Sequence, residues 1–119
     1  MKLITIERNG SLCALADDGC RITDVSSALE LLMTAAHEAG TKNIAIRKEL
    51  ITEDFFRLGT GLAGEILQKY VNYGGRLAIY GDYSRYTSKP LKDFIYESNH
   101  GLDVFFTATK EEAVDRLTR

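Results

Sequence analysis

The residues best placed for chemistry are a threonine and its flanking glycines, at the point where a helical pattern begins. Gly59, Thr60 and Gly61 precede apolar residues that repeat with helical spacing. A helix start carries unpaired N–H groups and the positive end of the helix dipole, so it suits an anion or a phosphorylated side chain. Thr60 therefore has two interpretations. It is either a helix N-cap that accepts from the N–H of Ala63, which is the commoner role, or a regulatory phosphorylation site or anion pocket.

A polar and aromatic loop is the second candidate site. Residues 82–89 follow a predicted parallel strand, and residues 48–60 follow another. Ligands of open α/β sheets bind outside the carboxyl ends of the strands, so we expect these two loops to meet. The alternative is a solvated loop whose tyrosines pack on the sheet edge. The candidate binding residues of this loop are Asp82, Tyr83, Arg85, Tyr86 and Lys89.

The remaining reactive side chains form no recognisable catalytic or metal-binding set. A carboxylate pair for acid–base work has four candidates, but no nucleophile and base are visibly paired with them. Cys13 and Cys20 fit neither a redox nor a zinc spacing, and His37 and His100 have no ligand-like neighbours. We therefore assign no catalytic residue, metal or cofactor, and enzymatic activity is the minority interpretation. The four acidic candidates are Glu49, Glu53, Asp54 and Asp82.

The chain begins with a pattern typical of a β-hairpin. Residues 3–8 alternate between apolar and polar side chains, Asn9 and Gly10 form a strong turn signal, and residues 12–16 return as the partner strand. Thr23 or Asp24 then caps a helix that ends at Gly40.

Strands and helices alternate over the rest of the chain. A capped helix follows each short apolar run, and such alternation favours right-handed crossovers and a mostly parallel sheet. We predict one α/β domain over residues 1–119, a hairpin followed by α-β-α-β-α-β-α. The predicted strands lie at 44–46, 77–80 and 104–106, and the later helices lie at 61–73, from Ser88 to Gly101, and from Thr109 onward.

Composition excludes several classes of protein. The net charge is −2 and the pI is about 5.7, without the clustered basic residues of a nucleic-acid binder. No apolar run approaches the roughly 20 residues that span a bilayer. Charge appears too early at the N-terminus for a signal peptide. We expect a cytoplasmic protein with no nucleic-acid or membrane partner.

Several runs of the sequence resemble a bacterial family of small proteins. The runs are TGLAGEILQKYVNY at 60–73 and YTSKPLKDFIYESN at 86–99, with EDFFRL and LAIYGDYS before them. This family is described as a domain of unknown function, number 4180 of that series, and it implies no activity.

The order of elements is also similar to that of STAS domains, the regulatory modules of sulfate transporters and anti-sigma-factor antagonists. The resemblance implies that Thr60 stands where those domains carry a phosphorylated serine. Two features depart from the STAS pattern: the motif aspartate and first serine are missing, and residues 51–58 are additional.

Two functions from different classes follow. The first is a regulatory or interaction module whose partner binds near the helix that starts at Thr60. The second is a binder of a small anionic ligand or nucleotide between residues 48–60 and 82–89. A homodimer through the hairpin edge or the last strand is a further alternative, because exposed strand edges pair readily.

Overall fold

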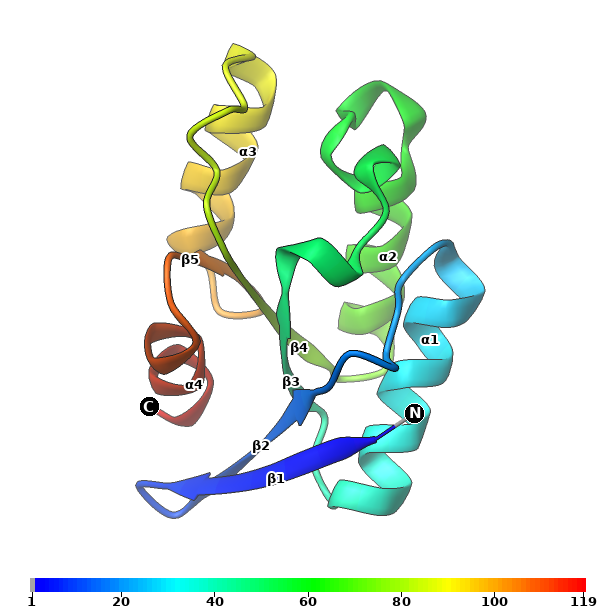
Figure 1. Cartoon of the computed structure of the whole chain (residues 1–119), viewed down its shortest axis with the longest axis vertical. Coiled ribbons are helices and arrows are strands. Elements are labelled where there is room, and N and C mark those ends of the chain that lie inside the picture. Colours follow the sequence, from blue (N-terminus) through cyan, green and yellow to red (C-terminus); the bar gives the residue numbers. More distant parts are fainter. Residues whose placement is uncertain (1) are drawn as a thin grey trace.

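The computed structural model describes residues 2–119 and contains a five-stranded sheet with four α-helices (Figure 1). The strands lie in the order in which they occur in the chain. The first two are antiparallel and all later neighbours are parallel. The predicted α/β class with a hairpin and a mostly parallel sheet is confirmed. The strands are β1 (Leu3–Arg8), β2 (Ser11–Ala16), β3 (Asn43–Arg47), β4 (Arg76–Tyr80) and β5 (Val104–Thr107).

The hairpin forms for the reason that its turn sequence indicates. Asn9 and Gly10 both adopt positive φ angles, 56° and 79°, which match a two-residue turn between twisted strands. Arg8 pairs with Ser11 across this turn, and the register continues to Leu3 opposite Ala16.

The helices are α1 (Val25–Thr34), α2 (Leu62–Asn72), α3 (Lys89–Asn99) and α4 (Lys110–Thr118), and three of them have the predicted side-chain caps. Asp24 forms a capping box with Ser27, Ser88 accepts from Leu91 N, and Thr109 accepts from Glu112 N. The helix after Asp24 was expected to run regularly to Gly40. Its last turn is instead a π-turn, Ala35–Ala39, which ends at a left-handed Gly40 whose N–H bonds five residues back.

Two cores cover the two faces of the sheet. Helices α1, α2 and α3 pack on one face and α4 packs alone on the other, as Figure 1 shows. The α4 face carries Ala45 and Ala78 at the centre of the sheet, so the helix approaches closely. Larger sheet residues, including Ile44, Ile46 and Ile79, fill the space beneath the other three helices.

Three short 3₁₀ turns connect β3 to α2, and they lie at the carboxyl end of the sheet. They are Lys48–Leu50, Glu53–Phe56 and Leu58–Thr60. Phe55 and Phe56 are buried, as predicted, and they anchor this segment to the core. None of the helices within residues 2–119 is long and apolar enough to cross a membrane.

Candidate functional site

The two loops that follow β3 and β4 meet at the carboxyl end of the sheet, as expected from their positions in the chain (Figure 1). The Glu53 carboxylate forms an ion pair with Arg85. It also accepts from the Tyr86 hydroxyl, with both carboxylate oxygens 3.0 Å away. These bonds cross more than thirty residues of sequence, so they fix the position of the second loop relative to the first.

Aromatic packing supports the same contact. The rings of Phe56 and Tyr86 stack with their centroids 5.1 Å apart. Tyr83 packs edge-on against Phe106, and its hydroxyl donates to the carbonyl of Ile79 at 2.7 Å. Burial raises the pKa of the Tyr83 hydroxyl well above its ordinary value, so this group stays a neutral donor.

Lys48 lies beneath this contact and is 7 % exposed. Its ammonium is 3.3 Å from the Tyr86 hydroxyl and 5.0 Å from the centre of the Tyr86 ring. The ion pairs found within residues 2–119 do not include Lys48. Within residues 2–119 the ammonium of this buried residue contacts one phenolic hydroxyl and two aromatic faces, which is unusual because a lysine taken out of water normally has a paired anion.

Gly81 makes room for Lys48. It follows β4 with a φ angle of 154°, which residues with a side chain rarely adopt. A Cβ atom at this position would lie 2.9 Å from the Cβ of Lys48. The exit of β4 therefore passes so close to the lysine stem that only glycine fits without a shift.

A hollow of about 440 Å³ opens beside Lys48, and we call it the crevice. Two of its lining side chains are cationic and three are anionic, so its surroundings are polar and of mixed charge. Hydrogen bonds from Ser84, its backbone N–H above all, hold the pKa of the Asp82 carboxyl below its usual range, so this group is ionised at neutral pH. The crevice is lined by Lys48, Glu49, Ile51, Glu53, Asp82 and Arg85.

A second hollow of about 440 Å³ also has Asp82 in its lining and lies next to the end of β5. Tyr83 and Phe106 form its apolar wall, and Thr107 adds a polar group. The carboxyl ends of β3, β4 and β5 thus surround two hollows that share one carboxylate.

The predicted N-cap role of Thr60 is wrong. Gly61 occupies the cap position with a φ angle of 78°, and Thr60 belongs to the preceding 3₁₀ turn. The Thr60 hydroxyl does not accept from Ala63. It lies 2.8 Å from the carbonyl of Asp54 and 2.9 Å from that of Arg57, and it accepts from Leu62 N at 3.2 Å.

The corner around Thr60 is open to solvent, but three of its N–H donors are already bonded within the chain. Gly59, Thr60 and Gly61 are all exposed, with Phe55 and Phe56 in the core. The N–H groups of Thr60 and Gly61 donate to carbonyls of residues 57 and 58. The Leu62 N–H donates to the Thr60 hydroxyl, so an incoming anion would find these three donors engaged.

The structure brings together only part of the predicted set. Asp82 and Arg85 line the crevice. Tyr83 and Tyr86 are not among its lining residues, and their rings pack against each other. Lys89 lies apart from the crevice lining, on α3, where its ammonium pairs with Asp93 at 2.6 Å. Lys48 was missed as a site residue, because a lysine that follows a buried strand ordinarily reaches solvent.

The four carboxylates considered for acid–base work divide between two places. Glu49, Glu53 and Asp82 line the crevice, whereas Asp54 pairs with Arg57 at its exposed surface. The Glu53 carboxylate is occupied by Arg85 and Tyr86. Within residues 2–119 no group of three or more His, Cys, Asp or Glu side chains could hold a metal ion.

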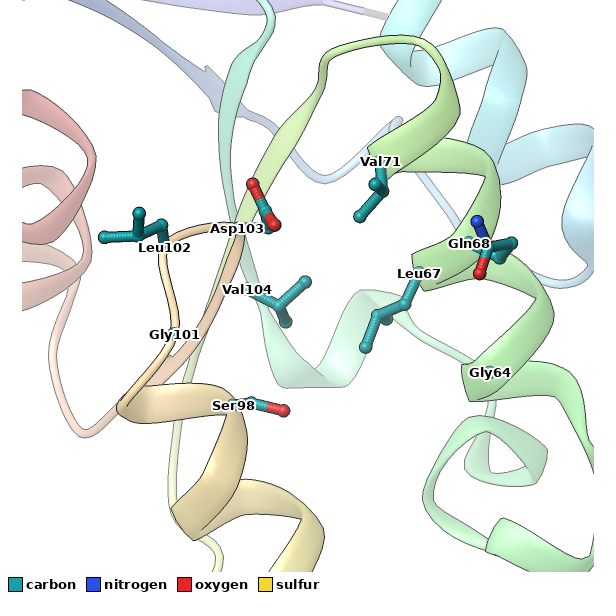
Figure 2. A pocket seen from close by; sticks show the side chains of 9 residues that line it. All are labelled: Gly64, Leu67, Gln68, Val71, Ser98, Gly101, Leu102, Asp103 and Val104. Carbon is teal, nitrogen blue, oxygen red and sulfur yellow. The ribbon is translucent and has the colours of Figure 1, made fainter.

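An apolar hollow of about 260 Å³ lies between α2 and the start of β5. Figure 2 shows Leu67, Val71 and Val104 pointing toward one another across it, with the hydroxyl of Ser98 at its rim. Val71 is 49 % exposed, and Leu102 at the margin is 77 % exposed. This surface is the most apolar opening among the three hollows.

Comparison with known proteins identifies a family. The model of a domain of unknown function, DUF4180, matches residues 7–117. Neither the curated proteins nor the solved structures with which the chain was compared include a match. Because the match covers nearly the whole chain, the protein belongs to this family.

Proposed function

We propose that this member of the DUF4180 family binds a small anionic molecule, of metabolite or nucleotide size, in the crevice. The observation that carries the proposal is Lys48. Lys48 is a buried residue that lines the crevice, and within residues 2–119 its ammonium has only one hydrogen-bond partner, although an ammonium can donate three bonds. A carboxylate or phosphate of the ligand would accept the remaining bonds of this ammonium and pair with it directly.

The other charges of the crevice narrow the class of ligand. Arg85 is exposed and can exchange part of its contact with Glu53 for a ligand oxygen, so the anionic group would sit between Lys48 and Arg85. Glu49 and Asp82 would repel a highly charged polyphosphate and accept from hydroxyl or amine groups. The best fit is a molecule with one anionic group and several hydrogen-bond donors.

A thermal-shift screen of the full chain tests this proposal, with carboxylic acids, amino acids, phosphate monoesters and nucleotides as probes. A ligand present at a hundred times its dissociation constant stabilises by about 2.7 kcal/mol, which corresponds to a melting temperature roughly 10 °C higher. Lys48→Met should remove this shift. It should leave the unliganded protein at least about as stable as before, because an apolar side chain of similar length replaces a buried charge.

Lys92→Met is the matched control, since Lys92 is exposed on α3. It removes the same charge from the chain and should keep the full ligand shift. A flat screen, or a ligand that stabilises wild type and Lys48→Met equally, would contradict binding in the crevice.

The apolar hollow beside α2 supports a second candidate function, an interaction module that docks a protein partner. We place the partner contact at Leu67 and Val71 rather than at Thr60, whose hydroxyl is engaged within the chain. An apolar side chain of the partner would fill the hollow, and the exposed Leu102 would flank it.

A photo-crosslinking residue at position 68, which lines the hollow, tests this second function in cells. We expect one discrete crosslinked protein that is lost when Val71→Arg is added. The same crosslinker at Lys92 should not capture it. A product whose yield is unchanged by Val71→Arg would show that the hollow is not the docking site.

The cellular setting is also a proposal. We infer a reducing, cytoplasmic location, because Cys13 and Cys20 are buried free thiols, and a bacterial host, because the sequence resembles a family of bacterial proteins. The STAS-like order of elements supports a regulatory role. Cell fractionation tests the location. The protein should be found in the cytoplasmic fraction, prepared without oxygen, and not in the secreted fraction.

A further inference from the structure

The sheet has two edges, and the protein closes one of them. Asn99, the last residue of α3, accepts from the backbone N–H of Phe106 at 2.7 Å. Its side-chain amide donates to the carbonyl of the same residue at 3.1 Å. These are two of the backbone groups that another strand would use to pair with β5. At Phe106 the Asn99 side chain therefore takes the place of a neighbouring strand.

Within residues 2–119, no side chain covers the edge formed by β1 in this way. The two-residue turn makes Arg8 and Ser11 the closing pair of the hairpin, so Arg8, Ile6 and Ile4 direct their backbone groups toward β2. Leu3, Thr5 and Glu7 then direct their backbone N–H and carbonyl groups outward, away from β2. Within residues 2–119, β2 is the only strand that pairs with β1.

The side chains of β1 also suit a partner. Ile6 packs against the α4 core, and Ile4, two residues away on the same face, is 49 % exposed. The strand reads Leu-Ile-Thr-Ile-Glu-Arg, without the proline, bulge or inward lysine that usually protects an exposed edge.

We propose that β1 pairs antiparallel with β1 of a second copy of the chain, with the two-fold axis at Thr5. Residues opposite one another in antiparallel strands have side chains on the same side of the sheet. Even-numbered residues of one β1 must therefore stand opposite even-numbered residues of the other, and odd-numbered opposite odd-numbered. An axis at Thr5 satisfies this condition and aligns Thr5 with Thr5. It also places Ile4 of each copy opposite Ile6 of the other, so the apolar pair is repeated twice.

A second copy fits this edge better than an unrelated strand because the strand is complementary to itself. In an antiparallel pair of identical strands, the outward N–H groups of each copy face outward carbonyls of the other. The same pairing covers the exposed Ile4 of both copies. The two sheets would join into a continuous ten-stranded sheet. The crevice lies at the ends of β3 and β4, so this pairing is independent of ligand binding there.

Sedimentation of the full chain over a range of concentrations tests the proposal, and wild type should show a monomer–dimer equilibrium. Thr5→Pro removes the outward N–H but keeps the bonds between β1 and β2. We therefore expect the dissociation constant of the dimer to rise about tenfold or more. Thr5→Val keeps the N–H and should keep the dimer. Ile4→Lys, which changes no backbone group, should also weaken the dimer, whereas Met33→Lys on α1 should not.

A cysteine pair tests the register. Residues in a hydrogen-bonded antiparallel pair have Cα atoms about 5.5 Å apart, within reach of a short bifunctional thiol reagent. Thr5→Cys should therefore form a covalent dimer with such a reagent, and Glu7→Cys should not, since the two copies of residue 7 would be far apart. A protein that stays monomeric at high concentration would overturn the proposal. A dimer that Thr5→Pro leaves intact and Thr5→Cys fails to crosslink would equally overturn it.

Discussion

Lys48 and Gly81 show how a single close contact shapes the candidate site. The glycine carries a φ angle of 154° and leaves no room for a Cβ atom beside the lysine. The lysine in turn lies under Tyr86, which ties the second loop to Glu53. The absence of one side chain at position 81 therefore permits the burial of a charged one at position 48.

We predict that Gly81→Ala destabilises the protein by roughly 1–3 kcal/mol, because it combines an unfavourable φ angle with overpacking. Urea denaturation measures the change. Ligand stabilisation in the crevice should fall with it, because Lys48 must move.

Gly64→Ala is the matched control for this change. A Cβ atom at Gly64 meets nothing within 4 Å, and the position lies in α2. Alanine there should raise stability by about 0.5–1 kcal/mol. Equal effects of the two substitutions would contradict the close contact at position 81.

At the scale of elements, the two outer strands are treated differently. β5 is bordered by the Asn99 side chain, whereas β1 is six residues long and, in the part of the chain that the structure describes, pairs with β2 alone. Arg116 strengthens the closed edge, because it donates to the Asn99 carbonyl at 2.5 Å and its guanidinium lies over the Phe105 ring. The ends of α3 and α4 thus hold one edge of the sheet together.

Asn99→Ala should destabilise the protein by about 1–3 kcal/mol, because it leaves the N–H and the carbonyl of Phe106 without partners. It should also expose a second sheet edge, so we expect a concentration-dependent rise in high-mass species. Urea denaturation and light scattering measure these two effects.

Asn72→Ala is a suitable comparison for Asn99→Ala. Asn72 accepts only from Gln68 on the exposed face of α2, at 2.9 Å. Its loss should change stability by less than about 0.5 kcal/mol and should leave association unchanged. If the Asn99 variant behaved in the same way, the closure of the β5 edge would have no energetic role.

The whole molecule carries several buried groups that lose a proton only at high pH. Burial raises the pKa of the Cys13 thiol to about 11 from an ordinary value of 9.0, and it raises the pKa of the Tyr70 hydroxyl as well. Both groups lie in the packed interior, one on each face of the sheet. Folding therefore favours their protonated forms.

The resulting pH dependence has a definite sign. Above pH 9.0 the unfolded chain releases the Cys13 proton, and the folded chain retains it up to about pH 11. The contribution of this group to stability is complete below the unfolded pKa, and we expect it to lose roughly 2–3 kcal/mol as the pH rises to the folded pKa. Urea denaturation at a series of pH values measures the slope.

Cys13→Ala should make the alkaline decline shallower than in wild type. Val114→Ala, a change of similar size in the same core, should lower stability at every pH without altering the slope. If the two variants had the same slope, Cys13 would not be the source of the decline.

Much of the local structure could be predicted from the sequence. Asn9 and Gly10 specify the hairpin turn, and Ser88 and Thr109 specify helix starts, because each depends on residues within a few positions. The same reasoning failed at Thr60. A left-handed Gly61 moved the cap by one residue, and the hydroxyl found carbonyls of the preceding turn.

The sequence by itself determined the alternation of strands and helices, the class of the sheet and the convergence of two loops at its carboxyl end. These properties follow from side-chain periodicity and chain direction, which are local. Only the tertiary structure decided that Lys48 is buried beneath Tyr86, that α4 alone covers one face, and that Asn99 closes one edge. Each of these depends on residues far apart in the chain, whose contacts form only when the elements pack together.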